Sequence, residues 1–210
     1  MKKPLILLAT ALLQACAHTP PVSKYTAISP SGVDLLRGKS IHIKAAPTPD
    51  MVQTTTGDQA TMTVGMLFGA IGGGVGAAVA MSHAKSRGHA LMIENEIPDP
   101  TPILKQRVEA MLVAKYGSTV ADAGYEVEVA TKSWALLKDN VVFTASVKLT
   151  DGAAPDPQIF ALGECRYTSQ TDPSTPPIEA LLDHHAEKLK ELLRKALEQC
   201  VQDFDQKVFI

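Results

Sequence analysis

The sequence predicts an α+β domain: a small antiparallel sheet of three to four strands flanked by two helices, together with a glycine-rich apolar helix. Three observations predict this class. Three stretches between residues 125 and 168 alternate apolar and polar side chains, as half-buried strands do. Two other stretches, one before and one after these strands, place apolar side chains at helical spacing. An uncharged, glycine-rich stretch lies upstream of all of them.

The first predicted elements are a strand and a helix. Residues 40–45 alternate apolar and polar side chains, and we expect this strand to join the edge of the sheet. Thr101-Pro102 pairs a capping residue with a proline, which predicts a helix start, and Gly117 predicts its end. The apolar face of this helix consists of Leu104, Val108, Met111 and Leu112.

The three central strands are predicted at 125–134, 141–149 and 160–168. Turn residues separate them, namely Lys138-Asp139-Asn140 and Asp151-Gly152. Thr175-Pro176 then opens the last helix. Its apolar face is expected to hold Leu181, His185, Leu189, Leu192, Ala196 and Cys200.

The N-terminus has the pattern of an export signal. Two lysines precede an uncharged, mostly apolar run from Pro4 to Leu13, which is too short to span a bilayer. The run ends in Leu13-Gln14-Ala15-Cys16, which resembles the lipobox of bacterial lipoproteins. The resemblance implies that residues 1–15 are a signal peptide and that Cys16 is lipidated. The alternative is an ordinary secretory signal in which the cysteine is fortuitous.

The same resemblance implies a place in the cell. Residue 17 is alanine, whereas an aspartate there favours retention in the inner membrane, so we expect an outer-membrane anchor facing the periplasm. Residues 16–38 are rich in proline and hydroxyl side chains and are expected to form a lipidated tether. Residues 39–210 then form the α+β domain, with the glycine-rich segment as an insertion at 60–84.

Two cysteines remain after lipidation, Cys165 and Cys200. An exported protein meets an oxidising compartment, so this even remainder predicts a disulfide between the last strand and the last helix. The alternative is a pair of buried free thiols. Their spacing resembles neither a zinc site nor a C-x-x-C redox pair.

The uncharged segment repeats small residues every four positions. One row consists of Gly65, Gly69, Gly73 and Ala77, and a second row consists of Gly72, Gly76 and Ala80. On a helix, such rows let another helix approach closely. The segment resembles the glycine zipper of many bacterial outer-membrane lipoproteins. Three interpretations stay open: a membrane-inserted or oligomer-forming helix, a helix packed on its own domain, and a glycine-rich loop.

Little in the chain predicts chemistry. The formal net charge of −2 and the 5% aromatic content argue against a nucleic-acid partner. His184 and His185 are adjacent and cannot form the i, i+4 pair of a helical zinc site. No nucleophile elbow or phosphate loop is present. We therefore expect no catalytic residue, no metal and no cofactor, and Trp134 is either an exposed contact for a partner or buried under the last helix.

Together these features predict a lipid-anchored cell-envelope protein with a structural, assembly or partner-binding role. Its expected partners are the membrane, through the anchor, another envelope protein, and further copies of the chain, through the glycine zipper. The alternative is an accessory lipoprotein of an envelope transport system that binds a protein or a lipid. A hydrolase is disfavoured.

Overall fold

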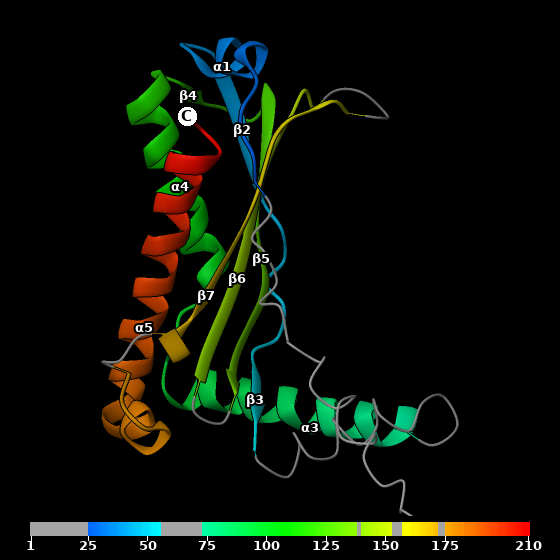
Figure 1. Cartoon of the computed structure of the whole chain (residues 1–210), viewed down its shortest axis with the longest axis vertical. Coiled ribbons are helices and arrows are strands. Elements are labelled where there is room, and N and C mark those ends of the chain that lie inside the picture. The colour runs from blue at the N-terminus through cyan, green and yellow to red at the C-terminus, as the bar shows by residue number, and fades with distance from the viewer. Residues whose placement is uncertain (1–24, 56–72, 138–139, 153–156, 172–174) are drawn as a thin grey trace, which may run out of the picture.

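The computed structural model describes residues 25–55, 73–137, 140–152, 157–171 and 175–210. Within these ranges a seven-stranded sheet carries two long helices on one face (Figure 1). The predicted signal peptide, the expected lipidation site Cys16 and the glycines Gly65, Gly69 and Gly72 lie outside the described residues.

The centre of the sheet is the predicted antiparallel meander. It consists of β5 (Tyr125–Leu137), β6 (Asn140–Thr150) and β7 (Ile159–Thr168). A bulge between Thr131 and Ser133 shifts the alternation of β5 by one residue. Consequently Val129 before the bulge and Trp134 after it both face the helices.

The prediction of a small antiparallel sheet with three to four strands is wrong, because the sheet is mixed and has seven strands. β2 (Ser40–Ala45) pairs in parallel with β5, and β4 (Thr119–Val120) pairs in parallel with β2. β3 (Val52–Thr54) runs parallel to the far end of β5, and β1 (Tyr25–Thr26) borders β7.

The physical reason for this difference is the connection between β2 and β5. That connection holds two helices, so it is long enough to bring the chain back to the same end of the sheet, as a parallel pair requires. The three other added strands contain only two or three residues each. Strands this short carry too little alternation to be recognised.

Part of the segment expected as a tether lies on the domain. Residues 25–36 include β1 and α1 (Pro30–Leu36), whose N-terminus is capped by the Ser29 side chain. The Ile28 amide donates to the carbonyl of Val208, and the Tyr25 hydroxyl donates to Asp203 at 3.0 Å. This stretch is therefore attached to the C-terminal end of the last helix.

Helix α4 (Pro100–Tyr116) is close to its prediction. Its N-cap is Asp99, whose carboxylate accepts from the Thr101 amide at 2.9 Å, so the helix begins one residue before the expected start. It ends at Gly117, which has the left-handed φ of 64° that a C-cap glycine supplies. The apolar face expected here is buried at Leu104, Val108 and Leu112.

Helix α5 (Ile178–Lys207) follows the short helical turn η2 (Ser169–Thr171) and is interrupted. Three successive residues, His184, His185 and Ala186, have φ values of 52°, 57° and 55°. The break turns the His185 side chain to solvent, so its expected place on the apolar face is wrong. The other expected positions of that face are buried, from Leu181 to Cys200.

We expect His185→Gly to raise the free energy of unfolding by about 1 kcal/mol, because a left-handed conformation costs most residues about 1–2 kcal/mol and glycine very little. Gln199→Gly is the matched control, since Gln199 is exposed in the regular part of α5. There glycine should lower the free energy by about 1 kcal/mol. Urea unfolding measures both, and equal losses would show that α5 is continuous.

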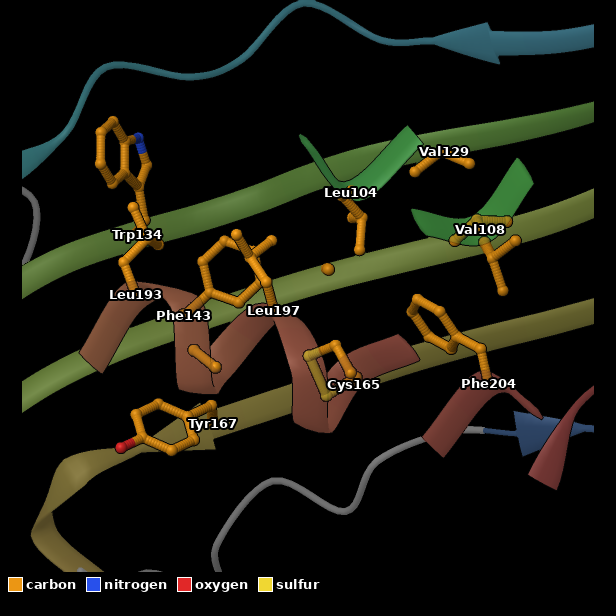
Figure 2. Packing of buried hydrophobic residues seen from close by; sticks show 14 of the residues in the cluster. Leu104, Val108, Val129, Trp134, Phe143, Cys165, Tyr167, Leu193, Leu197 and Phe204 are labelled. Carbon is orange, nitrogen blue, oxygen red and sulfur yellow. A yellow bond between two sulfur atoms is a disulfide. The ribbon is translucent and has the colours of Figure 1, made fainter. Parts of the chain in front are cut away.

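The core lies between the sheet and helices α4 and α5 (Figure 2). Trp134 is 4% exposed, and its indole nitrogen donates to the carbonyl of Pro49 at 2.7 Å. Leu193 of α5 lies beside it (Figure 2). Of the two roles weighed for Trp134, burial under the last helix is thus confirmed and exposure to a partner is wrong.

Candidate binding surfaces

A disulfide joins the sheet to the last helix. Cys165 of β7 and Cys200 of α5 are bonded, with their Cα atoms 5.3 Å apart, and both residues are fully buried (Figure 2). The predicted pairing is confirmed. The bond fixes α5 on the sheet, and it therefore also fixes the position of the side chains that α5 contributes to the surface.

Helix α3 (Gly73–Glu94) contains the second half of the glycine-rich segment and continues ten residues beyond the expected end at 84. Gly73 and Gly76 lie in its first turn. The row that begins at Gly72 continues as Ala80, Ala84 and Gly88, and these three residues are buried. This part of the segment is thus a helix packed on its own domain.

The contact between α3 and the domain is close. A Cβ atom on Gly88 would lie 2.1 Å from the carbonyl oxygen of Met51 and 2.6 Å from its carbon. Beside it, the Arg87 guanidinium donates to the carbonyl of Gln53 at 3.1 Å, and Lys85 is 3.6 Å from Asp50. Glycine at position 88 therefore lets α3 rest directly on the backbone next to β3.

The other side of α3 is open. Val79 and Ile93 lie on that side and are 50% and 65% exposed, and Met81, nearer the buried row, is 39% exposed. The N-terminal half of α3 extends away from the sheet, past β3 (Figure 1). Across the described residues, no helix combines the length and the apolar character that crossing a membrane would need.

The face of the sheet opposite α4 and α5 carries a shallow depression of about 230 Å³. Outward-facing side chains of neighbouring strands line it, since Glu128 pairs with Lys148, and Ser146 with Glu164. The full set of lining residues is Glu128, Lys132, Ser146, Lys148, Leu162 and Glu164. Alternation marks these residues as outward-facing in the sequence, but only the strand register shows that they meet.

Both signs of charge meet in this depression. Lys148 donates to Glu128 at 2.9 Å, and this hydrogen bond, with the charges of Lys148, Lys132 and Lys44, lowers the pKa of Glu128, while partial burial opposes the shift. Glu128 is therefore ionised over the physiological pH range. Such a surface suits polar, charged recognition rather than acid–base chemistry.

His184, His185 and His42 do not come together in a site in the described part of the chain. His184 and His185 are both exposed in the left-handed turn of α5, and His42 of β2 bonds the carbonyl of Asp122 through Nδ1 at 2.8 Å. In the described ranges, no group of three or more histidine, cysteine, aspartate or glutamate side chains is placed to hold a metal ion.

Comparison with known protein families, with curated proteins and with solved structures finds no match to this chain. Function must therefore be inferred from the chain's own residues.

Proposed function

We propose that this chain is a lipid-anchored protein of the bacterial cell envelope whose folded domain binds other envelope components. The observation that carries the proposal is the buried Cys165–Cys200 disulfide, taken with the predicted leader 1–15 that precedes Cys16. Structural disulfides persist mainly in oxidising compartments such as the periplasm. A lipid on Cys16, followed by Ala17, then predicts the outer membrane as the anchoring site.

The anchor is tested by Cys16→Ser in the full chain. We expect the wild-type protein to sediment with outer membranes and to carry the mass of its acyl chains, and the variant to lose both. Ala17→Ser is the matched control, because it changes the neighbouring residue and keeps the cysteine that carries the expected lipid. A Cys16→Ser protein that remains processed and membrane-bound would overturn the proposal.

Self-association through the glycine row Gly65, Gly69 and Gly73 is the proposed mode of assembly. It is supported by the position of α3, whose N-terminal half projects from the sheet and exposes Val79 and Met81. We expect Gly69→Leu to abolish the oligomers that crosslinking captures in the envelope, because a leucine keeps two helices apart.

Ala78→Leu serves as the control for this test, since Ala78 is exposed on α3 and belongs to neither glycine row. We expect its oligomers to match the wild type. If Gly69→Leu leaves the oligomers unchanged, the glycine row does not mediate assembly.

The second candidate is an accessory lipoprotein of an envelope transport system. The charged depression on the sheet favours it, because paired lysines and glutamates on a rigid sheet provide specific polar contacts for a partner. Affinity capture from detergent-solubilised envelope should recover a transport component with the wild-type protein. Lys148→Glu should lose that component, whereas Lys188→Glu on the far side of the domain should retain it.

A further inference from the structure

A second hollow lies between helices α4 and α5, on the side of the domain away from the sheet. Its volume is about 220 Å³. The apolar part of its lining comes from both helices and from the connection between α3 and α4, and consists of Pro98, Ile103, Leu193 and Leu197. Leu193 and Leu197 are almost fully buried and form its floor, while Ile103 is half-buried.

Every charged side chain that lines this hollow is basic. Arg107 comes from α4, and Lys190 and Arg194 come one turn apart from α5. The protein as a whole has a formal net charge of −2, so three cations around one apolar floor are a local departure from the composition.

Two of these cations are held in place. The side chain of Lys190 is 19% exposed and its ammonium lies 3.1 Å from Glu187, while Arg107 is 30% exposed and lies 3.3 Å from Glu198. Both glutamates are far more exposed, at 64% and 60%, and neither lines the hollow. Arg194 is exposed and makes no salt bridge within the described residues.

We propose that this hollow binds the head and first methylenes of an anionic lipid with a phosphate head group. Guanidinium and ammonium groups form short, charge-assisted hydrogen bonds with phosphate oxygens. The apolar floor contacts the first methylenes of the carbon chain. Their burial is favourable because it removes apolar surface from water, a contribution that the cations do not supply. At about 220 Å³ the hollow is smaller than pockets that enclose a whole drug-sized ligand, about 300–1,000 Å³, so it fits a head group and not an entire lipid.

This site is separate from the proposed anchor and from the glycine row. It involves neither Cys16 nor any residue of α3. A chain that fails the anchoring or crosslinking tests can therefore still bind the lipid, and the reverse also holds.

The test uses the full chain in phosphatidylcholine nanodiscs, with empty nanodiscs as the blank, and titration calorimetry. The probe is monomeric dihexanoyl phosphatidic acid. Dihexanoyl phosphatidylcholine supplies the same chains on a head group without net charge, and inorganic phosphate supplies the anion without chains. We expect phosphatidic acid to bind about tenfold or more tightly than either of them.

Arg194→Gln combined with Lys190→Gln should weaken phosphatidic acid binding about tenfold or more. Lys188→Gln is the matched control, because Lys188 is exposed on the same helix and does not line the hollow, and it should bind as the wild type does. Ile103→Ser should weaken phosphatidic acid binding and leave that of inorganic phosphate unchanged.

Three results would overturn the proposal. Equal binding of phosphatidylcholine would show that the cations do not select the ligand. Equal binding of inorganic phosphate would show that the apolar floor takes no part. Unchanged phosphatidic acid binding by the Arg194→Gln, Lys190→Gln variant, at an unchanged unfolding midpoint, would place any binding elsewhere.

Discussion

Replacing Cys165 and Cys200 together by alanine is expected to lower the free energy of unfolding by at least about 4 kcal/mol. The bond closes a loop of 35 residues, and the chain-entropy model gives about 4 kcal/mol for a loop of that length. Such a loss is a large part of the typical free energy of unfolding of a domain, which is about 5–15 kcal/mol. Equilibrium unfolding in urea, followed through the single tryptophan Trp134, measures it.

Both cysteines are fully buried, so the alanine variant also removes packed sulfur atoms. Two controls separate the effects. The wild-type chain unfolded with a reductant present should lose only the roughly 4 kcal/mol of the bond, because its sulfur atoms remain. A double valine variant should restore packing and keep most of the loss. If reductant leaves the unfolding midpoint unchanged, the bond does not constrain the unfolded chain.

The elements predicted correctly from the sequence are those whose residues repeat a signal. β5, β6 and β7 are each ten or more residues long and contain runs of alternating apolar and polar side chains, and α4 has a proline at its start and a glycine at its end. The pairing of Cys165 with Cys200 followed from simple counting. The strand and helix signals are local, so they can be recognised without knowing which residues pack against them, and the cysteine pairing needs only the cysteine count and the export signal.

The features that were missed depend on contacts between distant residues. The parallel pairing of Ile41 with Tyr125 joins residues that two helices separate in the chain. The break at His184 and His185 occurs within good helix spacing and has no glycine or proline to mark it. The sheet depression and the α4–α5 hollow are likewise set by register and packing, which one sequence does not reveal.

Gly88→Ala is expected to destabilise the protein by about 2 kcal/mol, although in an exposed helix the same change stabilises by about 1 kcal/mol. The sign reverses because the new methyl carbon would lie 2.1 Å from the Met51 carbonyl oxygen, which belongs to the backbone and cannot move aside alone. Either α3 or the chain before β3 must shift. Urea unfolding gives the free energy, and amide hydrogen exchange should show faster exchange in β3.

Ser86→Ala is the control for this prediction. Ser86 is exposed on α3, two residues before Gly88, and its hydroxyl donates to the carbonyl of Ser82 one turn earlier. Alanine there should change the free energy of unfolding by less than about 0.5 kcal/mol or raise it slightly. A stabilising Gly88→Ala would mean that α3 stands free of the domain. The row that runs from Gly72 to Gly88 would then be available to a second helix. A destabilising Gly88→Ala would instead leave only the glycines before Ala80 for assembly.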